Sequence, residues 1–314
     1  MSWARAIAAA ALGLVTSPAQ AGVWVHDPGS AWLQIGWRHT EASKVFTGSG
    51  TKVPMVSPKV AGRQLGELFE SGKFSGDELA MYAEVGVVKG LEVYGRLPVR
   101  WGSTTWDLPG PTELRQQNFG LGDALVGARA GGTRGPVALS LRAQVGMPLY
   151  DNRPAVLNRE AGNSDFYDDR PPLGQGTVDV DLGGGVGVGF GRGWAQVDQT
   201  VQLRNRGYST AFPGTAQLGL RAAPWLAGFG ELGWRLTVAD GYQPTFFLDE
   251  WSKSPLVIDR QHQLAVGGGV IVQPLAKRDG LEKGLGVSAR YDSIVVGRRA
   301  AAVRGLGVSL VWSL

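Results

Sequence analysis

Apolar and polar residues alternate strictly along this chain in segments of about ten residues, and this pattern restricts the fold more than any other feature. The clearest segment runs from Leu91 to Trp101, with apolar residues or glycine at every odd-numbered position and Glu92, Arg96 and Arg100 at even-numbered ones. Successive side chains of a strand point to opposite faces, so one face of this strand carries three charges and the other is apolar. The charged face requires water or partners, whereas the apolar face is suited to lipid.

Segments with this pattern recur along the whole chain and are predicted as membrane-spanning strands. A soluble β-sandwich is the alternative, but its strands are typically about five or six residues long. Segments near the length of a tilted transmembrane strand favour an all-β fold, a transmembrane antiparallel up-and-down β-barrel of about 12 strands. The predicted strands lie near residues 30–41, 78–88, 91–102, 119–130, 136–148, 177–190, 193–205, 214–222, 225–238, 260–272, 284–293 and 303–314.

The connections between these strands alternate in length, as in barrels with short periplasmic turns and longer extracellular loops. The predicted turns are 89–90, 131–135, 191–192, 223–224 and 274–283. The predicted loops are 42–77, 103–118, 149–176, 206–213, 239–259 and 294–302. Each odd-numbered strand precedes a longer loop, and if both termini lie on the periplasmic side, an even strand number follows.

Residues 1–21 are predicted to be a cleavable signal peptide, with Arg5 before an apolar run and the small-residue site Ala19-Gln20-Ala21 at its end. Residues 22–314 would then form the barrel. No later stretch approaches the roughly 20 apolar residues of a transmembrane helix. Export and strand pattern together predict the outer membrane of a Gram-negative bacterium, with outer-membrane lipid and the barrel-insertion machinery as partners.

Composition argues against several other function classes. The chain has no cysteine, which excludes disulfides and thiolate catalysis, and its formal charge of +4 includes no basic block that would suit nucleic acid. It has three histidines, His26, His39 and His262, and no serine motif beside them, so we predict that it is not an enzyme. The acidic cluster Asp165–Asp169 lacks calcium-loop spacing and is predicted to be a solvated loop tip. No metal or cofactor is therefore expected.

The inward face is predicted from strand parity, and it carries arginines and acids in similar numbers. This balance favours cross-strand ion pairs over a field of one sign, which an ion-selective pore would need. The predicted lumen-lining residues are Arg38, Tyr82, Glu84, Glu92, Tyr94, Arg96, Arg100, Asp123, Arg129, Arg142, Asp179, Asp181, Asp198, Glu231, Arg235 and Arg290.

Two functional interpretations of this face remain open. The lumen could be a hydrated conduit for a small-molecule solute, narrowed by the first or third long loop. It could instead be a closed, charge-paired filling of a structural or surface-interaction barrel, and pairing along the full length would favour this alternative. Twelve strands lie between filled eight-stranded barrels and open porins, so strand number does not decide.

Alternating glycines at 183–189 resemble a phosphate-binding loop but lack its lysine and following helix. In a strand they are expected to allow curvature, or the close approach of inward side chains or a loop.

Four stretches resemble the outer-membrane family named for the meta-pathway of phenol degradation, whose members are assigned as transporters. The stretches are Phe46–Pro54, Tyr94–Val99, Phe119–Arg129 and Gly146–Pro148. The resemblance implies an exported barrel for uptake of small, often aromatic or otherwise hydrophobic, compounds. The chain departs from the usual barrel pattern by ending with Leu314 rather than an aromatic residue.

Overall fold

The computed structural model describes residues 22–46, 49–55, 71–107, 113–150, 173–174, 177–205, 209–238, 261–273, 284–298 and 300–314. Within these ranges the regular elements are all β-strands. A search of the same ranges finds no helix with the length and apolarity needed to cross a membrane.

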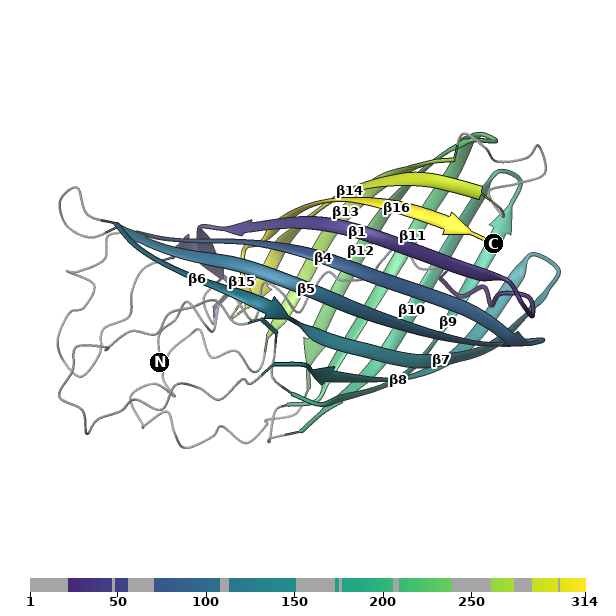
Figure 1. Ribbon diagram of the computed structural model, residues 1–314, viewed down its shortest axis with the longest axis horizontal. Coiled ribbons are helices and arrows are strands. Elements are labelled where there is room, and N and C mark those ends of the chain that lie inside the picture. The colour runs from purple at the N-terminus through teal and green to yellow at the C-terminus, as the bar shows by residue number, and fades with distance from the viewer. Residues whose placement is uncertain are drawn as a thin grey trace.

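Twelve positions around a closed antiparallel sheet form the barrel. Strands β6 and β7 occupy one position, because β6 pairs with the second half of β5 and β7 with its first half. The ring closes where β16 pairs with β1 and β1 with β4 (Figure 1). The strands are β1 (Ala31–Ala42), β4 (Ser71–Val88), β5 (Leu91–Asp107), β6 (Glu113–Leu121), β7 (Asp123–Arg134), β8 (Val137–Pro148), β9 (Asp179–Phe190), β10 (Gly193–Arg204), β11 (Ala211–Ala223), β12 (Leu226–Thr237), β13 (His262–Val272), β14 (Gly284–Arg298) and β16 (Arg304–Ser313).

The alternation predicted from the sequence is present in the side chains. Ile35, Leu79 and Leu97 are exposed on the outer surface, whereas Glu78 and Arg100 on the same strands are buried inside. Large apolar side chains therefore cover the outside of the wall, and the core of the molecule is polar. This arrangement is the reverse of a soluble protein and is typical of a transmembrane barrel.

The predicted loop 103–118 is wrong, because most of it is strand: β5 continues to Asp107 and β6 begins at Glu113. The first long loop is also shorter than predicted, since β4 begins at Ser71. Beyond the lipid both faces of a strand meet water or protein, so the alternation that marks a membrane span is not required there. Strands β4 and β5, with 18 and 17 residues, accordingly extend past most of the wall at the left of Figure 1, together with β6, which pairs with β5 as far as Asp107.

A second, three-stranded sheet lies at this loop end of the barrel. It consists of β2 (Lys44–Phe46), β3 (Lys52–Pro54) and β15 (Ala300–Ala301), in the order β15-β2-β3. Val45 and Phe46 are buried there. The predicted loop 294–302 is therefore also largely strand, because β14 runs to Arg298 before β15.

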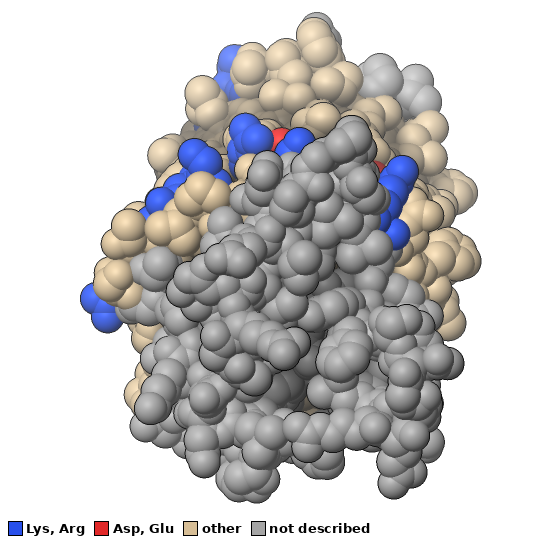
Figure 2. All heavy atoms as spheres, turned by 90° about the vertical axis from the view of Figure 1, so that its left-hand side faces the viewer, with Lys and Arg blue, Asp and Glu red and all other residues tan. Residues whose placement is uncertain are grey.

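Basic side chains gather along the rim of the described atoms at the loop end (Figure 2). They mark where the apolar outer band ends and water begins. The exposed ones on the strands that reach this end are Lys44, Lys52, Lys73, Arg115, Arg298 and Arg304.

Candidate functional site: the barrel interior

Cross-strand ion pairs line much of the inner wall, as the balance of charges predicts. A charge removed from water is tolerated only with a partner of opposite sign, because desolvation costs several kcal/mol per ion. The interior meets this requirement across neighbouring or nearby strands. The pairs are Arg38–Asp292, Arg96–Glu78, Arg100–Glu78, Arg129–Glu92, Arg142–Asp198 and Arg290–Glu231.

Glu78 holds two arginines at once. Arg100 Nε donates to one carboxylate oxygen at 2.6 Å, and Arg96 donates to the other. Arg100 also donates from NH1 to the carbonyl of Leu173 at 2.7 Å. Gly122 makes room for this arginine, because a Cβ there would lie 3.0 Å from Arg100 Cδ. Leu173 belongs to the third long loop, so part of that loop reaches the inner wall.

The N-terminal segment Gly22–Ser30, which we call the inner strap, crosses the interior near the turn end. The Val23 amide donates to Gln196 Oε1 on β10 at 3.4 Å, and Val23 is 1% exposed. At the other end of the strap, Gly29 N donates to the carbonyl of Gly86 on β4 at 2.9 Å. The strap therefore extends from β10 to β4 and covers this side of the lumen.

Glycines of β9 provide the space for the strap. A Cβ at Gly185 would lie 2.4 Å from Val23 Cγ1, and a Cβ at Gly187 would lie 2.3 Å from Val23 Cγ2. Distances this short are not compatible with a side chain. The predicted role of the glycine run, close approach of another segment, is confirmed at these two positions.

His26 anchors the strap to a buried cluster of charges. Its backbone N–H donates to Glu92 Oε2 at 2.9 Å, and its Nε2 lies 3.0 Å from Glu84 Oε2. The hydrogen bond to Glu84 raises the pKa of His26 above its ordinary value of 6.5, against the opposing effect of burial. His26 is therefore stabilised as the imidazolium, and its proton strengthens the contact between strap and wall.

The remaining contacts of this cluster satisfy every carboxylate oxygen. Tyr82 donates to Glu84 Oε1, and Arg129 NH1 donates to Glu92 Oε1 at 2.5 Å. Arg129 also lies 5.3 Å above the ring of Tyr94. His26, Glu84 and Glu92 bring metal-ligand atoms within 4.8 Å of one another. Arg129 supplies a positive charge and the carboxylate oxygens are occupied, so the cluster forms an ion-paired anchor in which Arg129 Nε and Nη2 have no hydrogen-bond partner.

A polar cavity of about 230 Å³ lies inside the barrel next to Gly22 of the strap. Its walls are formed by β5 and by the strands from β7 to β14. Gly22 of the strap is part of its lining. Among the residues predicted from parity, the cavity is lined by Arg96, Arg100, Asp123, Arg142, Asp179, Asp181, Asp198, Glu231, Arg235 and Arg290.

The other predicted residues lie outside this cavity lining. Five of them are the side chains that form or contact the anchor beneath the strap: Tyr82, Glu84, Glu92, Tyr94 and Arg129. The last, Arg38, pairs with Asp292 at 2.8 Å.

Sequence reasoning missed Glu78, His26 and the glutamines. Glu78 shares the inward parity of Tyr82 and Glu84 but stands at the first position of the predicted strand. His26 precedes a turn motif and carries no pattern that would place it inside. Gln144 and Gln202 are inward by parity, but a pattern of charges does not identify neutral side chains as partners for Asp181 and Asp179. The acidic cluster Asp165–Asp169 lies outside the described residues.

Comparison with known proteins identifies relatives in fold. No family model matches the chain, and no curated protein matches it. The COG4313 outer membrane channel from Pseudomonas putida F1 is similar with a TM-score of 0.64 and 12% identity, over 95% of this chain and 100% of that chain. A FadL homologue of Pseudomonas aeruginosa aligns with a TM-score of 0.40 and 10% identity, over 99% of this chain and 96% of that one. At such identities the first likeness shows the fold alone, and the chain has the fold of an outer-membrane β-barrel.

Proposed function

We propose that the protein is an outer-membrane channel through which small polar solutes pass along the barrel lumen. The observation that carries this proposal is the charged cavity inside a closed barrel whose outer surface is apolar. A barrel that serves only as a scaffold gains stability from filling its interior with packed side chains, and a polar cavity lined by charged side chains lacks part of that packing.

The alternative, a closed structural barrel, is favoured by the extent of ion pairing but fails at one part of the wall. Asp179 and Asp181 line the cavity and take no part in the ion pairs of the described strands. The inner face is thus not paired along its full length. In this proposal the strap narrows the lumen on the side that it covers.

The proposed solute is polar because the cavity lining is polar. A hydrophobic or aromatic compound, which the family resemblance implies, would have to displace water from charged side chains without replacing their hydrogen bonds. A small hydrogen-bonding solute can exchange with that water at little cost.

The test is single-channel conductance of the refolded barrel in planar bilayers. A chain that begins at Gly22, the predicted start of the mature protein, is compared with a variant that lacks Gly22–Val25 and keeps the His26 anchor. Removing these residues opens the space between the cavity and the turn end. We expect small steps from the native protein and larger ones from the shortened variant.

Folding is checked by heat-modifiable electrophoretic mobility in both proteins. Silence from both folded barrels would contradict the proposal and favour the closed scaffold. Equal conductance would show that the strap does not limit the lumen.

A further inference from the structure

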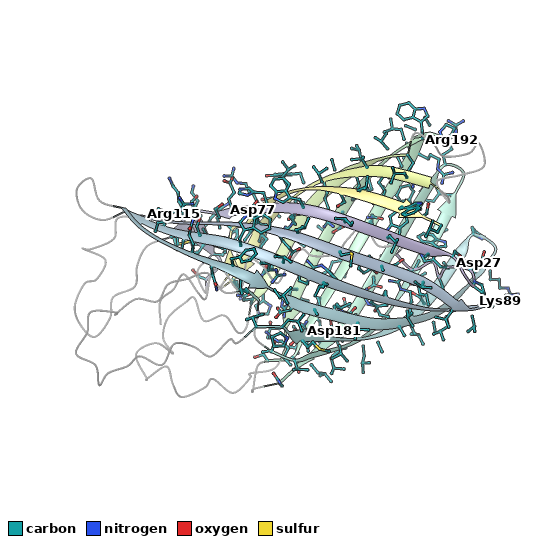
Figure 3. All side chains as sticks on the ribbon, in the orientation of Figure 1. Asp27, Asp77, Lys89, Arg115, Asp181 and Arg192 are labelled. Atoms are coloured by element: carbon teal, nitrogen blue, oxygen red, sulfur yellow. The ribbon has the colours of Figure 1, made fainter. Side chains whose placement is uncertain are left out.

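We propose that Asp179 and Asp181 form a recognition site for the protonated amine of a small organic cation within the lumen. The inference rests on the proposed function and names the solute class that the cavity would select. Both residues lie on β9, two positions apart, so their side chains share the inner face. Figure 3 places Asp181 between the ends of the barrel marked by Asp77 and Arg115 on one side and Asp27 and Lys89 on the other.

Asp181 has an acceptor that no described group uses. Its Oδ2 accepts a hydrogen bond from Gln144 Nε2 at 2.6 Å, whereas its Oδ1 is buried and has no hydrogen-bond partner. The residue is 8% exposed and lines the cavity. An unpaired carboxylate oxygen in such a place costs free energy unless a donor reaches it. A ligand in the cavity would provide that donor.

Neutral donors hold Asp179 in the same way. Thr177 Oγ1 donates to one oxygen at 2.7 Å and Gln202 Nε2 donates to the other at 3.3 Å. Hydrogen bonds from hydroxyl and amide groups orient these two carboxylates, and neither carboxylate has a cation within salt-bridge distance among the described residues. The two residues differ in this respect from Asp198, Glu231 and Asp292 of the same cavity, each of which forms a salt bridge with an arginine.

The basic groups around the site are each held by other partners. Arg142 pairs with Asp198, and Arg235 donates to Gln202 Oε1. Arg204 lies opposite Asp179 on β10, yet it donates from Nε and NH2 to the carbonyl of Ser209, at 3.0 and 2.6 Å. None of these guanidinium groups donates a hydrogen bond to the buried Asp181 Oδ1, and a ligand is the donor that we propose for it.

The chemistry of the surrounding groups favours an ammonium over a metal dication. Calcium takes six to eight oxygen ligands. Here Gln144 and Gln202 present their NH2 groups to the carboxylates, so their nitrogens rather than their oxygens face the site. An ammonium needs only a few acceptors and forms short, charge-assisted hydrogen bonds to a carboxylate.

The experiment measures binding of n-butylammonium to the refolded barrel in detergent by ligand-observed NMR. n-Butanol and butyrate serve as the neutral and anionic probes of the same chain length. We expect n-butylammonium to bind at least about tenfold more tightly than either, because only it can neutralise Asp181. Preference for butyrate, or no preference among the three probes, would overturn the proposal.

Two variants locate the site. Asp181→Asn keeps the size of the side chain and removes the charge, and we expect it to weaken n-butylammonium binding about tenfold. The matched control is Glu41→Gln, which removes an equal charge from an exposed residue paired with Arg304 at 2.8 Å. It should leave binding unchanged. Equal weakening by both variants would indicate general electrostatics and overturn the assignment.

If Asp181→Asn does not refold, the relative binding of n-butylammonium, n-butanol and butyrate to the native protein still tests the proposal. Failure of the channel proposal is distinguishable from failure of this one. A silent barrel that still binds n-butylammonium with charge selectivity retains the site without the conduit. A conducting barrel without that selectivity retains the conduit without the site.

Discussion

The partner of each inward acid, a guanidinium or a neutral amide, determines whether that acid can still bind a solute. An arginine placed opposite an acid on the inner wall contributes to stability and is no longer free to meet a ligand. Asp181, which receives an amide instead of a guanidinium, keeps one oxygen available. The extent of ion pairing on the inner wall therefore depends on a few side chains.

Glu78 should be the most costly inward acid to neutralise, because one carboxylate compensates both Arg96 and Arg100. Glu78→Gln leaves two buried guanidinium groups without a counter-charge. We expect the free energy of unfolding to fall by about 3 kcal/mol or more, as for other broken buried pairs. Equilibrium unfolding in denaturant measures it. The exposed acid Glu41, changed to Gln, should cost less than about 1 kcal/mol, and an equally small loss at Glu78 would contradict the role assigned to it.

His26 should make docking of the strap dependent on pH. Its pKa is raised in the docked state, so its contribution is fully present below the ordinary value of 6.5 and is lost as pH rises through the raised value. Glu84 is the direct partner of the imidazole, and the charges of Glu92 and Arg129 also act on it, with Tyr82 and Tyr94 in contact with Glu84 and Arg129.

The measurement uses Val23→Cys, because the natural chain has no cysteine. An impermeant thiol reagent should label the refolded variant faster as pH rises from about 6 to about 9, after correction for the reactivity of a free thiol. In the double variant with His26→Gln the corrected rate should be high and independent of pH. A flat profile in the single variant would show that His26 does not hold the strap.

At the scale of elements, the barrel strands could be predicted because lipid imposes one strict rule. Every membrane-facing position must be apolar, and the pleat then places polar residues on the other face. Outside the lipid this rule does not apply, so the sequence pattern predicts loops where Ser71–Gly76 of β4 and residues 103–107 of β5 form strand. Phe74 is buried there, but a single phenylalanine among glycines gives no period.

The site could be predicted only in part, since parity names the face of a side chain but not its partner. Arg204 illustrates this: it is inward and opposite Asp179, yet it bonds to the carbonyl of Ser209. The strap has no alternation at all. Its place in the lumen depends on glycines of β9 and on Gln196 of β10, which are far from the strap along the chain. Val23 and Gln196, for example, are 173 residues apart.

Strand β9 allows a test of the strap that leaves the wall intact. In Gly187→Ala the three atoms nearest to the new methyl would all belong to Val23 and Trp24 of the strap, and the closest would lie at 2.3 Å. We expect the strap to be displaced and the conductance to increase, with the barrel still folded. Gly189→Ala is the matched control, because its nearest atom would be 4.0 Å away. Equal conductance in the two variants would exclude a gap-filling role for the strap.

At the scale of the whole molecule, the two ends of the barrel should be distinguishable from outside the cell. Lys52 lies in the second sheet at the loop end, whereas Lys89 lies in the turn between β4 and β5 (Figure 3). With the turns in the periplasm, Lys52→Cys should react with an impermeant thiol reagent on intact cells and Lys89→Cys should react only after lysis. The opposite result would invert the orientation.

The second sheet has a consequence for the seam where the first and last strands meet. β2 follows β1 and β15 precedes β16, so their pairing joins the two chain segments that close the ring. Sliding β16 by two residues along β1 would preserve the alternation of faces but would pull Ala300 away from Phe46. A shift of β16 along β1 would therefore break the pairing of β15 with β2 outside the lipid. The alternation of apolar and polar side chains alone would not prevent a shift of two residues. The pairing of β15 with β2 therefore helps to fix the register between β1 and β16, and this effect does not depend on Leu314.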